Sequence, residues 1–145
     1  MFNSYAIYTD GAFRREPLVT GGWAALVVTP TGNLMYSGHC EPKDALEAEL
    51  RAVVNGLGKI PPNAEVHLYC DNSSVVDGLQ GTANKSNRQQ HLRLWKRLRY
   101  MTAHRRVHAH WVRSHDGNHY NELVDMAARQ AAHRGKNVKN NRNSR

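Results

Sequence analysis

Three short apolar runs rich in strand-forming residues open the chain. They span Tyr5–Thr9, Gly22–Val28 and Leu34–Gly38, and the turn signal Thr29-Pro30-Thr31-Gly32 lies between the last two. A connection as short as this turn joins neighbouring antiparallel strands. We therefore expect the chain to begin with an antiparallel meander.

From residue 44 onward the apolar residues follow a helical period. Asp44 is expected to cap a helix over residues 44–60, which the Pro61-Pro62 pair ends. Beyond it we expect strands at Val66–Cys70 and Val107–Val112 and helices at Ser74–Leu79, Gln89–Thr102 and His119–His133. Strands that are joined through helices usually return parallel to their neighbours. The order βββαβααβα therefore predicts an α/β fold with a five-stranded mixed sheet, three antiparallel strands followed by helix-linked parallel strands, flanked by helices.

The length of 145 residues suits a single domain. Residues 135–145 contain almost no apolar side chains, so we expect one domain over residues 1–134 and a basic disordered tail over residues 135–145. The sequence has no apolar run long enough to span a bilayer, and Cys40 and Cys70 lack metal-site spacing and are expected to be reduced thiols. These features favour a cytoplasmic monomer without membrane association.

The positive charge is concentrated in the second half of the chain. The formal net charge is +8, yet residues 1–77 carry nine acids and five bases, whereas residues 78–145 carry three acids and fifteen bases. Such asymmetry is typical of proteins that bind a polyanion, although a basic surface can also serve solubility alone.

Two aspartates follow predicted strands. Asp10 comes after the first strand and before Gly11, and Asp71 ends the run that begins at Glu65. If the two strands are parallel neighbours, both carboxylates emerge at the same edge of the sheet, where they repel each other unless a cation joins them. One aspartate after a strand can equally be a turn residue or a helix cap, so the pair is the better evidence.

Glu49 lies on the apolar face of its predicted helix, among Leu46, Leu50, Val53 and Leu57. A buried glutamate is costly unless it is paired or metal-bound, so we interpret Glu49 as functional. Glu47 falls on the polar side and has Arg51 four residues later, so we interpret it as structural.

Oxygen ligands without an accompanying His or Cys set suit Mg²⁺, or Mn²⁺ in its place. Together with the basic half, they indicate phosphodiester cleavage by two metal ions, one activating water and one stabilising the leaving 3′ oxygen. Ser73, Ser74, Ser114 and Cys70 lie near the predicted site, but no G-x-S-x-G motif accompanies them, so a protein nucleophile is not expected.

A series of motifs along residues 5–132 resembles type 1 ribonucleases H. They are Tyr8-Thr9-Asp10-Gly11, Gly21-Gly22-Trp23-Ala24-Ala25-Leu26, Ala48-Glu49-Leu50-Arg51-Ala52, Cys70-Asp71-Asn72-Ser73, Leu94-Trp95-Lys96-Arg97-Leu98, Trp111-Val112-Arg113-Ser114-His115-Asp116-Gly117 and Asn121-Glu122-Leu123-Val124-Asp125-Met126-Ala127. The last is similar to the family's N-E-x-x-D-x-x-A element, so the resemblance adds Asp125 as a fourth carboxylate. On its helix alone, Asp125 lies toward the polar side and would be explained by the helix dipole.

The resemblance implies that Asp10, Glu49, Asp71 and Asp125 hold two Mg²⁺ ions, with no small-molecule cofactor. It also implies endonucleolytic hydrolysis of the RNA strand of RNA/DNA hybrids, leaving 5′-phosphate and 3′-hydroxyl ends. Two alternatives stay open. One is a nuclease of the same fold that acts on double-stranded RNA or hybrid junctions, and the other is a hybrid-binding module that no longer cleaves.

Three departures from the family pattern concern groups that face the substrate. We align the family's loop histidine with Asn118, which His119 follows, so both are catalytic candidates, and His119 is alternatively an exposed helix-start residue. The family's groove-reading asparagines are replaced by Asp44-Ala45-Leu46, and only Gly81–Arg88 stands where many bacterial members carry a long basic insertion.

Basic residues on the second long helix offer another route to the phosphate backbone. Arg93, Lys96 and Arg97 share one arc, opposite the apolar positions Leu94, Trp95, Leu98 and Met101. Trp95 therefore belongs to the core rather than to a base-stacking site. We expect the backbone near Gly11 and the Asn72 side chain to contact the RNA 2′-hydroxyls together with Glu49, and the basic tail to add salt-sensitive affinity.

Overall fold

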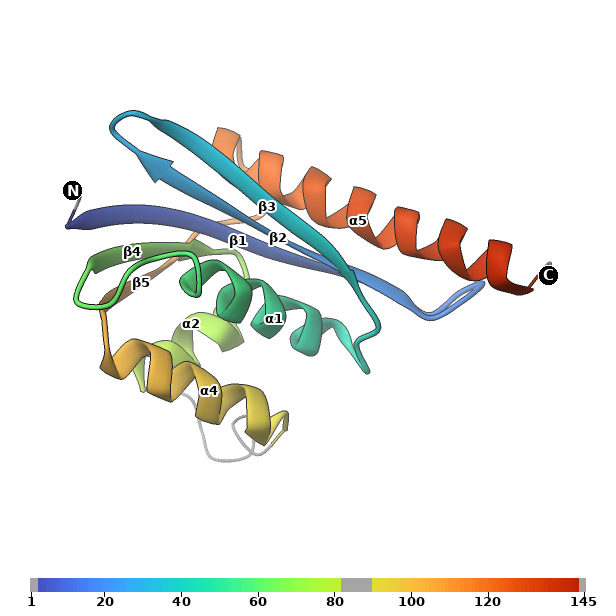
Figure 1. Cartoon of the computed structure of the whole chain (residues 1–145), viewed down its shortest axis with the longest axis horizontal. Helices are drawn as coiled ribbons and strands as arrows, with labels where there is room; N and C mark the ends of the chain where they lie inside the picture. The colour runs from blue at the N-terminus through green and yellow to red at the C-terminus, as the bar shows by residue number, and fades with distance from the viewer. Residues whose placement is uncertain (1–2, 82–89, 144–145) are drawn as a thin grey trace.

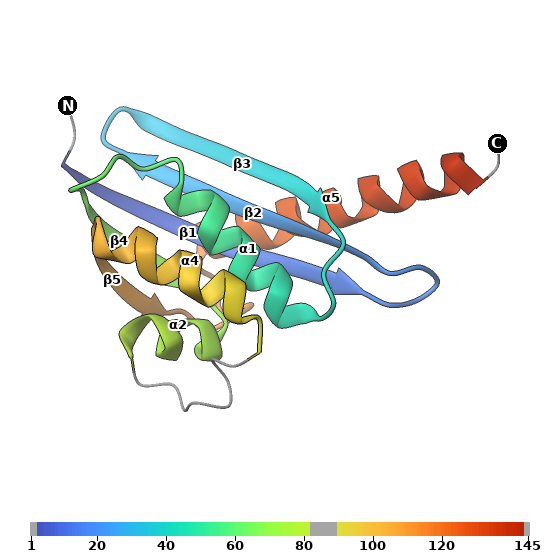
Figure 2. The ribbon, with the colours of Figure 1, turned by 60° about the horizontal axis from the view of Figure 1, so that its bottom comes forward.

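The computed structural model describes residues 3–81 and 90–143. A twisted sheet forms its centre, and helices pack on both faces (Figures 1 and 2). The strands are β1 (Ser4–Arg14), β2 (Thr20–Thr29), β3 (Gly32–Cys40), β4 (Glu65–Cys70) and β5 (Arg106–Trp111). The helices of the described residues are α1 (Ala45–Leu57), α2 (Ser73–Gln80), α4 (Leu92–Ala103) and α5 (His119–Asn143). This order of elements agrees with the sequence prediction.

The sheet has five strands in the order β3-β2-β1-β4-β5. The pairs β1/β2 and β2/β3 are antiparallel, and the helix-linked pairs β1/β4 and β4/β5 are parallel. The predicted mixed sheet is therefore confirmed, and β1 stands at its centre beside β4.

One face of the sheet is covered by α1, which packs on β1 and β2 and has α4 beside it. The large apolar core lies there, between strand residues such as Ile7 and Leu68 and helix residues such as Leu50 and Leu98, all at most 1% exposed. Trp95 and Met101 also lie in this core, as predicted from their arc of α4. Burial of this apolar surface is the main stabilising contribution to the fold.

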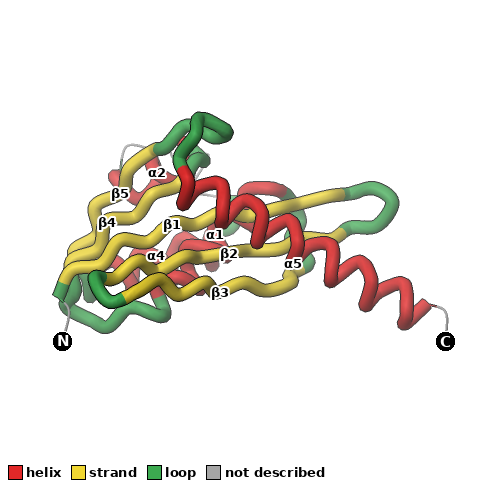
Figure 3. The backbone as a smooth tube through the Cα atoms, turned by 90° about the horizontal axis from the view of Figure 1, so that it is seen from above, coloured by secondary structure: helices red, strands yellow, loops and turns green. Residues whose placement is uncertain are grey.

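On the opposite face, α5 crosses β2, β1 and β3 (Figure 3). It packs on them through small residues, because a Cβ added at Gly22 would lie 2.2 Å from the carbonyl oxygen of Ala128. The Thr20 hydroxyl also donates a 2.8 Å hydrogen bond to the carbonyl oxygen of Ala132. Close approach of backbone to backbone therefore fixes where α5 crosses the sheet.

Strand β1 is longer than predicted, and this changes the place of Asp10. The prediction ended the strand at Thr9, but β1 continues to Arg14 because it stays paired with β2 as far as Arg14 opposite Thr20. Its pairing with β4 stops at Thr9 opposite Cys70. Asp10 thus lies within β1, at the first position beyond the parallel ladder.

Helix α5 also runs further than predicted. A helix ending at His133 followed by a disordered tail was expected, whereas α5 is helical to Asn143. A helix that is already anchored by packing extends at little cost, since propagation avoids the nucleation penalty, and residues 134–143 contain no proline. The predicted start of α4 at Gln89 and most of the segment Gly81–Arg88 lie outside the described residues.

The N-terminus of α1 confirms the expected cap but corrects the place of Glu47. Asp44 Oδ1 accepts a 2.8 Å hydrogen bond from the Glu47 backbone N–H, and Arg51 Nε lies 3.3 Å from Glu47 Oε2. Glu47 was predicted on the polar side, yet it is only 7% exposed. The reason is tertiary packing: the His91 ring, which precedes α4, covers Glu47, with His91 Nδ1 3.7 Å from Glu47 Oε1.

No described helix is both long and apolar enough to cross a membrane.

Candidate active site

The register of β1 and β4 brings two of the predicted carboxylates together. Thr9 pairs with Cys70, so Asp10 and Asp71 are the next residues on two adjacent parallel strands. Both side chains therefore leave the sheet at its carboxyl edge, the usual position of a functional site in an open α/β sheet. Asp10 is 4% exposed, and Asp71 is half-buried.

Glu49 reaches the same place because α1 lies unusually close to β1. A Cβ built on Gly11 would lie 2.4 Å from the carbonyl carbon of Ala48 and 2.5 Å from the backbone nitrogen of Glu49. Only glycine permits this approach, which brings the Glu49 side chain within hydrogen-bonding reach of Asp10 in β1. Glu49 is 7% exposed, as its place on the apolar face of α1 predicted.

The carboxylates of Glu49 and Asp71 form a compact group with the thiol of Cys70. One ligand atom from each of the three lies within 4.8 Å of the others, and Cys70 Sγ is 4.0 Å from Glu49 Oε2. Burial and the neighbouring Glu49 carboxylate raise the pKa of Cys70 well above its ordinary value. Because a protonated, fully buried thiol is a poor nucleophile, Cys70 is a packing residue here.

The fourth carboxylate comes from α5. Asp125 is close enough to Asp10 for their side chains to share a hydrogen bond, and its Oδ2 accepts a 2.6 Å hydrogen bond from Arg129 one turn later. The buried Asn121, on the same helix, hydrogen-bonds Asp71. Helix α5, which only the family resemblance assigned to the site, therefore supplies the Asp125 carboxylate and also the Asn121 amide, which orients the Asp71 carboxylate.

Crowding of these acids strongly perturbs their protonation. Burial, together with the charges of Asp71 and Asp125, raises the pKa of Asp10 from 3.8 to about 7, against a hydrogen bond with Glu49 that lowers it. Burial and Asp10 raise the pKa of Glu49 well above its ordinary value. Burial and Asp125 raise the pKa of Asp71, while Asn121 and His115 act in the opposite direction. Such a set of acids is stabilised when a cation binds between them.

His115, which the sequence interpretation did not select, acts electrostatically on one of these carboxylates. The charge of His115 lowers the pKa of Asp71, and the φ of 57° at His115 gives the loop after β5 a sharp bend. Asn118 caps α5 instead, because its Oδ1 accepts a 3.0 Å hydrogen bond from the Asn121 backbone N–H. His119 is exposed and lies against the Tyr120 ring at 5.6 Å. The quoted motif already contained His115, but only the structure shows that its charge acts on Asp71.

The predicted substrate-binding residues fall in two places. Gly11 and Asn72 adjoin the carboxylates, with Asn72 Oδ1 accepting a 3.1 Å hydrogen bond from the Val75 N–H at the start of α2. Arg93, Lys96 and Arg97 are exposed on α4, as expected. A groove between α1 and α4 is lined by two of these bases and by two more from the region of α1, namely Arg93, Arg97, Lys43 and Arg51. We call this the basic groove. The two helices that line it, α1 and α4, both begin on the side of the molecule toward which β1 ends (Figure 2).

Known proteins resemble this chain over nearly its whole length. The RNase H family model matches residues 3–133. A ribonuclease H of Wolbachia sp. subsp. Drosophila simulans (strain wRi) is 34% identical over 136 residues, covering 87% of this chain and 93% of that protein. A ribonuclease H of Neorickettsia sennetsu is 33% identical over 140 residues, covering 88% and 92%.

Solved structures share the fold at lower identity. The N-terminal RNase H domain of a Mycobacterium tuberculosis protein aligns with a TM-score of 0.77 at 21% identity, covering 94% of this chain and 98% of that one. LC11-RNase H1, solved in complex with an RNA/DNA hybrid, aligns with a TM-score of 0.76 at 17% identity, covering 90% and 98%. The family match, the relatives and the convergence of four acids on one sheet edge lead to one conclusion: the chain belongs to the ribonuclease H family.

Proposed function

We propose that the protein is an endonuclease that hydrolyses the RNA strand of RNA/DNA hybrids with the carboxylates Asp10, Glu49, Asp71 and Asp125. The observation that carries the proposal is the convergence of these four side chains from β1, α1, β4 and α5 at one edge of the sheet. The complex of the related LC11-RNase H1 with an RNA/DNA hybrid supports the choice of substrate.

The site fits hard divalent cations. Two of its acids, Asp10 and Glu49, are buried and have raised pKa values, so the apo site carries a cost that a cation relieves. The four carboxylates would hold Mg²⁺, or Mn²⁺ in its place, since both ions prefer oxygen ligands. When bound, two such ions supply an activated water and stabilise the leaving 3′ oxygen, which gives 5′-phosphate and 3′-hydroxyl ends.

The chain's own residues position these groups. Asn121 fixes the Asp71 carboxylate by a hydrogen bond, and Gly11 lets Glu49 approach Asp10. His115 lies in an exposed loop and its charge acts on Asp71, so we infer that it takes or gives a proton at the departing group. We therefore assign to His115 the role that the sequence interpretation gave to Asn118 and His119.

Hybrid binding would use the basic groove and the rim of the carboxylate site. Arg93 and Arg97 can pair with backbone phosphates, and Lys96 adds charge on the same exposed arc. The Gly11 backbone and the Asn72 side chain stand next to the catalytic edge, where RNA 2′-hydroxyls would be read in a shape-driven, sequence-tolerant manner.

The experiment is Mg²⁺-dependent cleavage of a labelled hybrid by wild type, Glu49→Gln and Asp71→Asn. Cleavage by both variants should be slower by a factor on the order of a thousand or more, because each removes a charged ligand from the metal site. Asp116→Asn is the matched control, since this exposed loop carboxylate is not one of the four acids assigned to the metal site. Substantial residual cleavage by Asp71→Asn would refute the site as drawn.

The same assay with double-stranded RNA and DNA duplexes separates the alternatives. Preference for the hybrid supports the proposal. Preference for double-stranded RNA would indicate a same-fold nuclease of another specificity, and tight hybrid binding without Mg²⁺-dependent cleavage would indicate a binding module.

A further inference from the structure

The face of the sheet that carries α5 is only partly covered by it. Helix α5 packs on β1, β2 and β3, and no described helix packs on this side of β4 and β5 (Figure 3). A row of half-exposed or exposed polar side chains occupies the uncovered strands, with Glu65, His67, Tyr69, His108 and His110 at alternate positions. The function proposed above does not use these residues.

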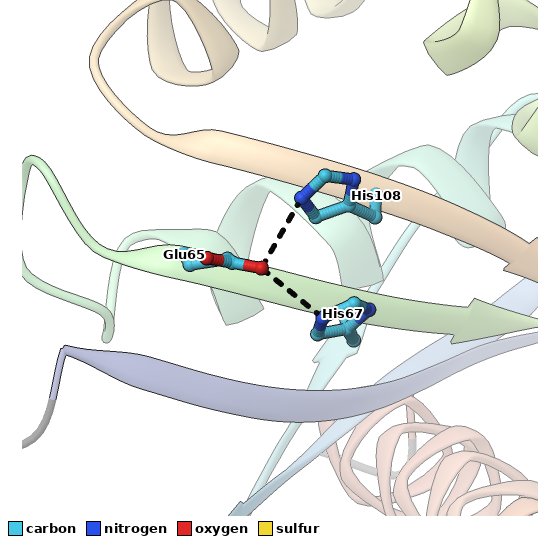
Figure 4. Close-up of side chains that lie close together, drawn as sticks. All are labelled: Glu65, His67 and His108. Carbon is cyan, nitrogen blue, oxygen red and sulfur yellow. Dashed lines mark ion pairs between the residues drawn. The ribbon is translucent and has the colours of Figure 1, made fainter.

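Strand geometry brings three metal-binding side chains of this row together. Glu65 and His67 are two residues apart on β4, so they point to the same face, and His67 pairs in register with His108 on β5. Figure 4 shows both imidazoles turned toward the Glu65 carboxylate. One ligand atom from each lies within 4.8 Å of the other two.

The distances suit a shared ion better than direct hydrogen bonds. His67 Nε2 and His108 Nε2 each lie 3.5 Å from the same oxygen, Glu65 Oε1. An N–H···O hydrogen bond is usually about 2.7–3.2 Å long. Ligand atoms around a tetrahedral Zn²⁺, bound at about 2.0–2.1 Å, are instead separated by about 3.3–3.4 Å. The three ligand atoms, which lie within 4.8 Å of one another, would form three corners of such a tetrahedron once they close to that spacing.

A fourth residue orients one of the ligands. His67 Nδ1 lies 3.0 Å from His110 Nε2, and the two rings stack with centroids 5.3 Å apart. When His67 donates a hydrogen bond from Nδ1 to His110, the lone pair on His67 Nε2 faces Glu65. Metal-bound histidines usually have this arrangement, in which one ring nitrogen binds the metal and the other donates a hydrogen bond to a neighbouring residue.

We propose that Glu65, His67 and His108 form a binding site for a transition-metal ion of the Zn²⁺ class, with water in the fourth position. Two imidazoles and one carboxylate suit Zn²⁺ and are a poor set for Mg²⁺, which prefers oxygen ligands. The site is separate from the carboxylate site: His67 precedes Asp71 by four strand residues, a span of about 13 Å. A bound ion would join β4 to the edge strand β5 near their amino ends.

One cation competes for the same carboxylate. Arg106 Nη2 lies 3.8 Å from Glu65 Oε2, the oxygen that faces away from the two imidazoles. The Arg106 side chain is 72% exposed, so this pair is weak and leaves Glu65 Oε1 available to an ion.

The test is Zn²⁺ binding to the 145-residue chain in millimolar Mg²⁺, which would occupy the carboxylate site. Competition with a chromophoric chelator gives the affinity, and Co²⁺ absorption reports tetrahedral coordination. Wild type should bind one Zn²⁺ under these conditions, and His67→Ala, His108→Ala and Glu65→Gln should each bind it at least tenfold more weakly. His39→Ala, which removes an exposed histidine of β3, is the matched control and should bind within twofold of wild type.

Two further measurements separate loss of the site from loss of the fold. Hybrid cleavage in Mg²⁺ should be unchanged in the three ligand variants, and Zn²⁺ should shift the imidazole nitrogen resonances of His67 and His108 in the wild-type protein. Wild-type affinity in both His67→Ala and His108→Ala would overturn the proposal. Displacement of all bound Zn²⁺ by millimolar Mg²⁺ would also overturn it, because the ion would then be at the carboxylates.

Discussion

Replacing Asp10 with asparagine should stabilise the metal-free protein while removing its activity. Burial and the neighbouring acids raise the pKa of Asp10 from 3.8 to about 7, so the folded state holds this proton more tightly than the unfolded chain does. Below about pH 4 the protonated aspartate therefore does not lower the free energy of unfolding. As the pH rises, its ionisation lowers that free energy increasingly, and the loss is complete above pH 7. The neutral asparagine avoids that loss.

The magnitude follows from the same pKa. Each tenfold change in an acid dissociation constant corresponds to about 1.4 kcal/mol, so the upper limit is about 4 kcal/mol at pH 8. The net gain is smaller, because Glu49 ionises more readily once the Asp10 charge is gone. We expect Asp10→Asn to raise the free energy of unfolding by about 2–4 kcal/mol at pH 8 and by less than about 1 kcal/mol at pH 4.5.

Urea unfolding in EDTA, followed by circular dichroism at several pH values, measures this difference. Asp116→Asn, in an exposed loop, is the control and should show no comparable gain at either pH. Added Mg²⁺ should stabilise wild type more than Asp10→Asn, since a ligand stabilises the state that binds it. Equal stability of wild type and Asp10→Asn at pH 8, or a gain that does not change with pH, would refute the account of a crowded acidic site.

Three further predictions test how the site is built and used. Gly11→Ala should lower the free energy of unfolding by about 1–3 kcal/mol and slow hybrid cleavage, because the added Cβ would meet the backbone of α1. Unchanged thermal unfolding would contradict this prediction. His115→Ala should lower kcat and move the acidic limb of the pH–rate profile to higher pH, because the charge of His115 lowers the pKa of Asp71. His39→Ala is the control, and an acidic limb that does not move in His115→Ala would contradict this role. Replacing both Arg93 and Arg97 with alanine should raise KM for the hybrid and leave kcat little changed. The plot of log binding constant against log salt concentration should become less steep, by up to about 0.9 in slope for each phosphate that is no longer neutralised. An unchanged slope would exclude the groove as the binding surface.

The spacing of apolar residues along the chain predicted the helices and strands well, because each element repeats its apolar residues with the period of its own secondary structure. The three opening strands, the helix after Asp44 and the apolar arc of α4 around Trp95 all follow from residue spacing. The ends of elements depend on partners that lie far away in the chain. β1 continues to Arg14 because β2 pairs with it, and Glu47 is buried because His91 packs over the start of α1.

Three carboxylates could be assigned from the sequence for physical reasons: Asp10 and Asp71 follow apolar strand runs, and Glu49 is a charge on an apolar helix face. Asp125 needed either the family resemblance or the path of α5, because its own helix gives it an ordinary polar position. Our proposed assignment of the site histidine is His115 in place of Asn118 and His119, because the surroundings of these residues depend on the path of the loop between β5 and α5.

The α/β class, the acidic core of the site and the basic second half of the chain follow from residue type and spacing alone. Which side chains meet depends on how distant segments pack together. Strand register placed Asp10 beside Asp71 at one end of β4 and His67 beside His108 toward the other. Register depends on pairing between distant segments, and a slip of one residue would turn every side chain to the opposite face.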